Sequence, residues 1–306
     1  MYVIGVDMLD IKLATLLTVA KEKNFTKAAE KLSLTQPAVS HHIGQLEEEL
    51  NTRIFTRAKS GLRLTSEGEI VLRYAERLQS LYDKMLEELS DSERHMTKIR
   101  VGITHTAESN LITEILAKYG AQEDNVTITI NTDTIKHLYN MLATYQLDLA
   151  FIEGKPTDPS LNHILLDTDY LACVLPVTHP LATHSMISLS ELKNEQMILR
   201  LPSSGTRKLF EAALLSINES IDSFNITLEV DNIATIKDLI RKELGVSILP
   251  KSACMDELKK GKLAVLPIEN LSMPREMNIV YNRDFSHTEI LSDLVKLYRE
   301  EERKES

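Results

Sequence analysis

The chain has 306 residues, which is enough for two or three domains that each bury a core of their own. Its formal net charge is −10, and residues 1–92 hold 12 basic and 14 acidic side chains, so any contact with nucleic acid must be local. The two cysteines, Cys173 and Cys254, have no partner at metal-ligand or redox spacing, and no apolar run reaches the length of a membrane span, which excludes a disulfide scaffold and a membrane-spanning protein.

The first residues predict a cytoplasmic location. The segment MYVIGVDM lacks the basic start of a signal peptide and meets Asp7 early, so we expect no export signal. Cys173 lies in an apolar run at 170–175, which indicates a small buried hydrophobic residue rather than a reactive thiol.

Residues 9–23 predict an amphipathic helix. Leu9, Leu13, Leu16, Leu17 and Ala20 recur at steps of about one helical turn. We expect this helix to pack behind the segment that follows it.

Residues 25–32 predict a second, short helix with one apolar side. Phe25, Ala28, Ala29 and Leu32 recur at one-turn spacing, and Thr26 can cap the start. A brief break at residues 33–34 separates it from the next helix.

A third helix is predicted from Thr35, which can cap it. Pro37 falls in the first turn, where the missing N–H costs little. The buried face carries apolar residues at steps of four, three and four, namely Val39, Ile43, Leu46 and Leu50. The opposite face shows small polar groups at its N-terminal end, namely Gln36, Ser40 and His41.

Residues 53–65 alternate apolar and basic side chains around Lys59-Ser60-Gly61, which predicts a two-stranded hairpin. A helix pair with a tight turn is the helix-turn-helix arrangement, whose second helix reads base edges in the major groove. Gln36 can pair with adenine, and nearby basic residues can hold phosphate. From these residues alone, a helix pair with a merely solvated polar face fits equally well.

A family resemblance favours the DNA-binding interpretation. Residues 25–68 resemble the winged helix-turn-helix of LysR-type transcriptional regulators, at Phe25-Thr26, Ala28-Ala29, Leu32, Thr35-Gln36-Pro37-Ala38-Val39-Ser40, Ile43, Leu46-Glu47, Leu50, Phe55, Arg57, Leu64-Thr65 and Gly68. The sequence departs at Asn51, where the family has glycine; asparagine tolerates the left-handed backbone this position needs. His41 and Gly44 stand where the family often has basic or amide side chains, which leaves the base code open. We assign DNA contacts to Thr35, Gln36, Pro37, Ser40, His41, Arg53, Arg57, Lys59 and Arg63.

A long helix is predicted after the hairpin, because Ser66-Glu67-Gly68-Glu69 fits a capping box. Its apolar stripe is too long for the small N-terminal domain to cover, although docking on that domain is an alternative. The resemblance implies a dimer helix with a seam at Val71, Leu78, Tyr82 and Met85. We expect a homodimer or homotetramer on two related half-sites of promoter DNA, with RNA polymerase as a further partner.

From Lys98 onward, short strands alternate with helices, which predicts mainly parallel sheets. The resemblance implies a fold of class α/β: an all-α-type winged helix-turn-helix followed by a two-lobed effector domain like the type II periplasmic binding proteins. The expected domains are 1–65 for DNA binding, 66–96 for the linker helix and a hinge at residues 90–97, and 97–306 for the effector. Lobe I takes 97–165 and 269–306, and lobe II takes 166–268.

Polar strand-to-helix turns predict the ligand site, because ligands of parallel α/β sheets bind at the carboxyl ends of strands. The strongest is the run 200–207, RLPSSGTR, which resembles the loop of relatives that sense oxyanions or small anionic metabolites. Hydroxyls and free N–H groups there suit an anion, although each turn alone fits ordinary helix capping. We expect a carboxylate or oxoanion effector, and no other cofactor, at Thr104, Thr106, Thr132, Ser203, Ser204, Thr206 and Asn232.

The sequence shows no catalytic set, metal-ligand cluster or phosphate-binding loop, so we expect no enzyme activity. A cytosolic solute-binding protein that sequesters its ligand is the alternative. It would explain the second half of the chain but not residues 9–89.

Overall fold

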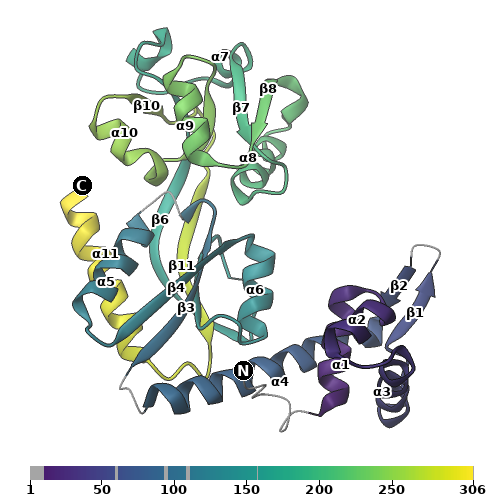
Figure 1. Cartoon of the computed structure of the whole chain (residues 1–306). Helices are drawn as coiled ribbons and strands as arrows, with labels where there is room; N and C mark the ends of the chain where they lie inside the picture. Colours follow the sequence, from purple (N-terminus) through teal and green to yellow (C-terminus); the bar gives the residue numbers. More distant parts are fainter. Residues whose placement is uncertain (1–9, 59–60, 93–95, 108–110, 157, 306) are drawn as a thin grey trace. The chain divides into compact units, whose positions relative to one another are not determined.

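The computed structural model describes residues 10–58, 61–92, 96–107, 111–156 and 158–305 (Figure 1). The chain divides into two compact units. The first holds the residues up to Thr97 together with Ala143–Gln146, and the second holds Lys98–Leu142 and Leu147–Ser306. Each unit is described by itself.

Three helices form the core of the first unit: α1 (Ile11–Glu22), α2 (Phe25–Leu32) and α3 (Gln36–Glu49). Leu16 and Val19 of α1 pack with residues of α2 and α3, namely Ala28, Ala29, Val39, Ile43 and Leu46. Thr35 caps α3, as expected, by accepting a hydrogen bond from the Ala38 amide at 3.4 Å. The left-handed conformation expected at Asn51 is present, with φ of 47°.

The cap expected for α2 was wrong by two residues. Asn24 is the N-cap, and its Oδ1 accepts hydrogen bonds from the amides of Thr26 and Lys27. The physical reason is that Phe25 already has helical backbone, so Thr26 lies inside the first turn and the cap must precede it.

The hairpin forms as expected from β1 (Phe55–Ala58) and β2 (Gly61–Leu64), which pair antiparallel from Phe55↔Leu64 to Ala58↔Gly61. Phe55 meets Phe25 edge to face, with ring centroids 6.0 Å apart, so the hairpin is fixed to α2. The turn residues Lys59 and Ser60 lie outside the described part of the chain.

The long helix α4 (Ser66–Ser92) begins at Ser66, one residue earlier than expected, because a capping box with Ser66 as the cap would start the helix at Glu67. Thr65, not Ser66, accepts the hydrogen bond from the Gly68 amide, at 2.8 Å. A Cβ on Gly68 would stand 2.1 Å from the Ile54 carbonyl oxygen, so glycine lets α4 lie directly against the chain before the hairpin. Residues 90–92 of the expected hinge are helical, and residues 93–95 lie outside the described range.

The apolar residues of α4 divide between two faces. Val71, Leu72 and Ala75 pack against the core of the first unit. A second row, at steps of four and three, is exposed: Ile70, Tyr74, Leu78, Leu81, Met85 and Leu89. Val71 therefore belongs to the domain core, and Tyr82 is half-buried.

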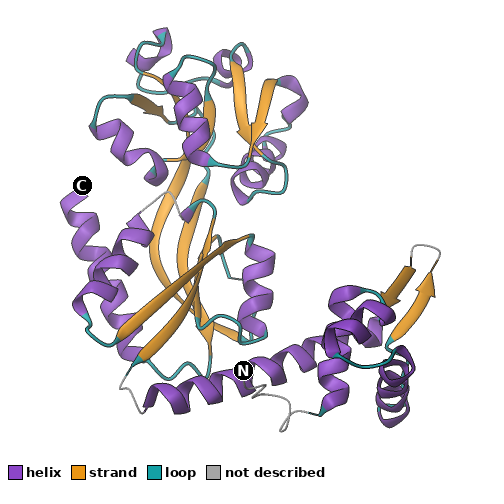
Figure 2. Cartoon of the chain, in the orientation of Figure 1, coloured by secondary structure: helices purple, strands orange, loops and turns teal. Residues whose placement is uncertain are grey.

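The second unit is built on one large mixed sheet in the order β10-β6-β11-β5-β3-β4, with β9 also paired to β6 (Figure 2). Its first lobe contains β3 (Thr97–Thr104), α5 (Leu111–Gln122), β4 (Val126–Asp133), α6 (Ile135–Ala143), β5 (Leu149–Glu153) and α11 (Thr288–Glu305). Leu149 and Phe151 of β5 face α5 and α11, whereas Ala150 and Ile152 face α6, because strand side chains alternate.

The second lobe contains α7 (Leu189–Lys193), β7 (Gln196–Arg200), α8 (Gly205–Ser216), β8 (Asn225–Val230), α9 (Ile233–Arg241), β9 (Ser247–Pro250), α10 (Met255–Lys259) and β10 (Leu263–Leu266). Three 3₁₀ turns at Pro180–Thr183, Ile221–Ser223 and Ser252–Cys254 join them. Parallel β7 and β8 pair at the edge of this lobe.

Two long strands run between the lobes: β6 (Leu161–Pro176) and β11 (Pro274–Asn282) (Figure 1). They pair antiparallel with each other, and β6 continues antiparallel to β9 and β10. The expectation of mainly parallel sheets was wrong here, because a strand that enters a lobe and a strand that leaves it must run in opposite directions.

The last helix, α11, continues through the charged C-terminal residues to Glu305. Tyr298 donates to Asp167, and Glu301 pairs with Lys118 of α5 at 2.6 Å. These contacts hold the last turns against the first lobe. None of the helices in the described ranges is long and apolar enough to cross a membrane.

Candidate nucleic-acid interface and polar seam between the lobes

The N-terminal turns of α3 present an uncovered polar surface. Thr35, Gln36, Pro37, Ser40 and His41 are all exposed, while the apolar side of the helix is buried. The Gln36 amide Nε2 donates to Ser40 Oγ at 2.7 Å, so the two side chains brace one another. This leaves the Gln36 carbonyl oxygen and one amide hydrogen available for a partner.

Basic residues lie close to this surface along the chain. The Arg53 side chain is 84% exposed, although one guanidinium nitrogen pairs with Glu47 at 2.9 Å. Arg63 on β2 is exposed, and Arg57 lies on β1. Lys59 lies outside the described residues.

Glu47 is a brace that the sequence reasoning missed. Its Oε1 accepts hydrogen bonds from the Ile54 amide at 2.7 Å and the Phe55 amide at 3.2 Å, while Oε2 pairs with Arg53. One carboxylate thus fixes the first hairpin strand to the end of α3. The sequence match at Leu46-Glu47 was a signal for it, but its partners lie seven and eight residues away, where the hairpin begins.

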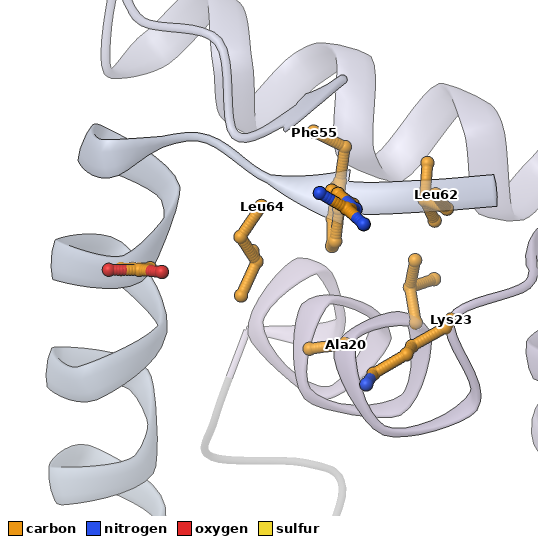
Figure 3. A pocket seen from close by; sticks show the side chains of 8 residues that line it. Ala20, Lys23, Phe55, Leu62 and Leu64 are labelled. Carbon is orange, nitrogen blue, oxygen red and sulfur yellow. The ribbon is translucent and has the colours of Figure 1, made fainter. Parts of the chain in front are cut away.

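The described parts of the chain contain hollows in both units. One, of about 530 Å³, lies between α1, the hairpin and the start of α4; Phe55, Leu62 and Leu64 face Ala20 and Lys23 across it (Figure 3). The other, of about 630 Å³, lies on the first lobe and is lined by Pro156, Asp158, Pro159, Leu161, Asn162, His163 and Tyr281. Neither contains the turns at which the sequence places an effector.

Those turns lie instead along a line of polar contacts. Thr104 ends β3 and Glu153 ends the parallel strand β5, so both stand at the same edge of the sheet. Thr104 Oγ1 donates to Glu153 Oε2 at 2.5 Å and accepts from the Ala107 amide at 3.1 Å. Thr104 therefore caps the turn that follows it and holds Glu153 in place.

Arg200 joins the two lobes. It ends β7 in the second lobe and is only 3% exposed, yet its Nη1 donates to Thr106 of the first lobe at 3.4 Å. Nη2 pairs with Asp231, which precedes α9, at 3.2 Å. Burial lowers the pKa of the Arg200 guanidinium, while the hydrogen bond and charge of Asp231 raise it.

Arg275 lies on β11, which together with β6 forms the pair of crossing strands that run between the lobes. It lies opposite Asp169 in the register of β11 and β6, and Nε and Nη2 each stand 3.4 Å from Asp169 Oδ2. Its Nη1 lies 3.7 Å from Glu153 Oε1. Ser252 of the second lobe donates to the same Asp169 oxygen at 2.7 Å. We call the connected set the polar seam: Thr104, Thr106, Glu153, Asp169, Arg200, Asp231 and Arg275.

The N-terminus of α8 adjoins the first lobe. Ser204 caps α8 by accepting from the Arg207 amide at 3.1 Å. A Cβ on Gly205 would stand 3.5 Å from Ile135 Cδ1 of α6, so the helix end lies against the first lobe. Thr206 is buried, and its hydroxyl has no hydrogen-bond partner within the described structure.

The other predicted effector residues are less closely joined. Asn232 caps α9 by accepting from the Thr235 amide at 3.0 Å, next to the Asp231 that pairs with Arg200. Ser203 is exposed, and Thr132 is half-buried at the end of β4. Within the described residues, no hydrogen bond links Thr132 to the polar seam.

The sequence reasoning did not select Arg200, Glu153 or Arg275. Arg200 and Glu153 each end a recognisable buried strand, so their position carried a signal. Arg275 carried none, because its partner Asp169 is 106 residues away in sequence.

Among the described residues, neither a reactive thiol nor a metal-binding group is found. Cys173 and Cys254 are buried, and desolvation raises the pKa of each thiol to about 12, so neither forms thiolate at neutral pH. No group of three or more His, Cys, Asp or Glu side chains among the described residues could hold a metal ion.

Comparison with known proteins identifies the class. Residues 12–69 match the bacterial regulatory helix-turn-helix family of LysR proteins, and residues 92–303 match the LysR substrate binding domain. The chain belongs to the LysR family of transcriptional regulators. Its fold is therefore the expected winged helix-turn-helix followed by the two-lobed effector domain.

Individual relatives agree over nearly the whole length. The HTH-type transcriptional regulator CysL of Bacillus subtilis is 30% identical over 275 residues, covering 88% of this chain and 90% of CysL. The structure of full-length CbnR complexed with its target DNA aligns with a TM-score of 0.65 at 17% identity, over 96% of this chain and 99% of that one. The regulatory domain of Synechocystis CcmR in complex with 2-PG aligns with a TM-score of 0.58 at 20% identity, over 66% of this chain and 97% of that domain.

The brace at Glu47 can be tested by Glu47→Ala. The substitution removes the acceptor of two backbone amides, and an unpaired buried donor costs about 1–3 kcal/mol. We expect the free energy of unfolding of the first unit to fall by about 2–4 kcal/mol. Urea unfolding followed by circular dichroism measures it, with the exposed neighbour Glu48→Ala as the matched control. Equal unfolding midpoints for the two variants would contradict the brace.

Proposed function

We propose that this LysR-family regulator binds dyad-symmetric promoter DNA through α3 and responds to a small anionic effector held between the lobes of its second unit. The uncovered polar start of α3, beside exposed Arg53 and Arg63, is the observation that carries the proposal. RNA polymerase is the proposed partner at the promoter.

The proposed reading contacts come from Thr35, Gln36, Pro37, Ser40 and His41. A glutamine on a helix in the major groove can bond adenine through both amide groups, and Ser40 already holds Gln36 on the exposed side. We assign phosphate contacts to Arg53, Arg57, Lys59 and Arg63. Because Arg53 forms an ion pair with Glu47, we expect it to contribute less to DNA affinity than Arg63 does.

The proposed dimer contact is α4. The exposed apolar residues along this helix form a row at coiled-coil spacing: Ile70, Tyr74, Leu78, Leu81, Met85 and Leu89. Leu78 and Met85 stay in the seam as the sequence suggested, whereas Val71 is already packed within its own unit. A homodimer or a pair of such dimers would cover the row.

The proposed effector contacts are Thr104, Thr106, Thr132, Ser203, Ser204, Thr206 and Asn232. The buried, unpartnered Thr206 hydroxyl supports an anion at the N-terminus of α8, where backbone N–H groups and the helix dipole favour negative charge. CcmR with 2-PG supports a small ligand in this kind of domain. Arg200 bridges the lobes through Thr106. An effector bound beside it changes the arrangement of the lobes only if it binds one arrangement more tightly than the other.

Base reading is tested by Gln36→Ala. We expect a loss of about 1–3 kcal/mol on a specific duplex and little change on a scrambled one, since only base-edge contacts distinguish the two. Gel-shift titrations measure both affinities. Gln45→Ala, an exposed glutamine later on the same helix, is the control and should leave both unchanged. Equal losses on the two duplexes would rule out base reading by Gln36.

The dimer contact is tested by Leu78→Asp combined with Met85→Asp. Two carboxylates buried in an apolar seam would lack partners, so we expect the mass measured by light scattering to fall at micromolar concentration. Arg73→Asp, on an exposed polar position of the same helix, should leave the mass unchanged. An unchanged oligomer of the folded double variant would reject this seam.

The effector contact is tested by Thr206→Val, which keeps the shape and removes the hydroxyl. For the small anion that most raises the Tm of the wild type, we expect calorimetry to show binding weakened about ten-fold, the loss of roughly one hydrogen bond to a charged group. Effector-free DNA affinity should not change. Thr183→Val, an exposed threonine of the same lobe, is the control. Unweakened binding to Thr206→Val would show that the site lies elsewhere.

A further inference from the structure

The polar seam is not a simple anion site, because it is richer in acid than in base. Glu153, Asp169 and Asp231 supply three carboxylates, and Arg200 and Arg275 supply two guanidinium groups. A plain anion entering the seam would therefore add negative charge beside the largely buried carboxylates of Glu153 and Asp169.

One carboxylate oxygen of Glu153 accepts no hydrogen bond from the described residues. Its side chain is 8% exposed, and Oε2 receives the Thr104 hydroxyl. Oε1 is buried and accepts no hydrogen bond in the described structure, and the Arg275 Nη1 that faces it stands 3.7 Å away, beyond hydrogen-bond length. A buried carboxylate oxygen without a donor is unfavourable, which makes this atom a place for a ligand donor.

Donors that form no hydrogen bond occur in the same seam and at the adjoining helix end. Arg200 Nε and the Thr206 hydroxyl are both buried and form none within the described residues. Arg275 Nη2 is buried too, and it has only the ion pair with Asp169, at 3.4 Å. Glu153 and Arg275 touch one another, and Arg200 reaches the same turn, 104–106, that holds Glu153. The unsatisfied atoms thus comprise donors suited to an anionic group and one acceptor suited to a cation.

We propose that the effector is a small zwitterion of the amino-acid class. Its ammonium group bonds Glu153 Oε1, and its carboxylate accepts hydrogen bonds from the Thr206 hydroxyl and Arg200 Nε. This inference rests on the effector site proposed above and adds the requirement for a positive group. Glu153 is then the residue that rejects ligands lacking an ammonium group, because they would leave its oxygen unpaired.

The test uses the full-length protein and matched pairs of probes: the twenty common amino acids, each beside its deamino counterpart, such as alanine with propionate or aspartate with succinate. Thermal shift finds the binding pairs, and calorimetry gives their Kd values. We expect at least one amino acid to bind ten-fold or more tightly than its deamino counterpart. In Glu153→Gln that preference should fall below about three-fold, because the neutral amide does not select for charge.

Two further variants separate charge from folding. Glu153→Asp keeps the carboxylate and should keep most of the preference, while Glu123→Gln removes an exposed carboxylate near the amino end of β4 and should change nothing. Binding of deamino probes as tight as that of amino acids, or a preference that survives Glu153→Gln, overturns the zwitterion but leaves an anion site. No binding by any probe of either kind contradicts both the zwitterion and the proposed effector site.

Discussion

The second unit depends on one buried ion pair, Arg275 with Asp169. The two residues face each other in the register of β11 and β6, the strands that run between the lobes. Each would be costly to bury alone, so removing either partner would leave an uncompensated charge. Because Ser252 of the second lobe also bonds Asp169, the pair fixes the crossing strands and the second lobe at the same point.

The same pair sets the position of the seam. Arg275 turns its third nitrogen toward Glu153, Glu153 holds Thr104, and the turn that contains Thr104 meets Arg200 through Thr106. The Arg200–Thr106 bond is 3.4 Å long and reaches the first lobe through a single hydroxyl. An effector that binds the unpaired atoms nearby would therefore compete with this bond, while the Arg275–Asp169 pair still holds the crossing strands together.

How much of the structure the sequence could predict depends on how far apart the interacting residues lie in the chain. Features that depend on neighbouring residues were predicted: Thr35 caps α3, Asn51 has the left-handed backbone conformation, and the hairpin has its expected strands. The caps at Asn24 and Thr65 were missed by one or two residues, because several capping side chains stand together and only the backbone selects one.

Contacts between distant segments could not be predicted in this way. The apolar run at 170–175 is only a part of the sixteen-residue strand β6, whose first half, LNHILLDT, does not alternate apolar and polar side chains. The surroundings of the Glu153 carboxylate likewise come from separate strands, because Thr104 lies on β3 and Arg275 on β11. The sequence therefore predicted the turns that carry the hydroxyl groups of the candidate site, but the charged residues beside them were found only in the tertiary structure.

Hydrogen–deuterium exchange on the full chain tests most directly whether the seam between the lobes is the effector site. The protein is compared with and without the small molecule that most raises its Tm. The account predicts slower exchange at residues 104–107 and 201–207, the two turns that meet through Arg200 and the start of α8. Protection confined to residues 156–163, around the hollow on the first lobe, or an absence of change at both turns would contradict it.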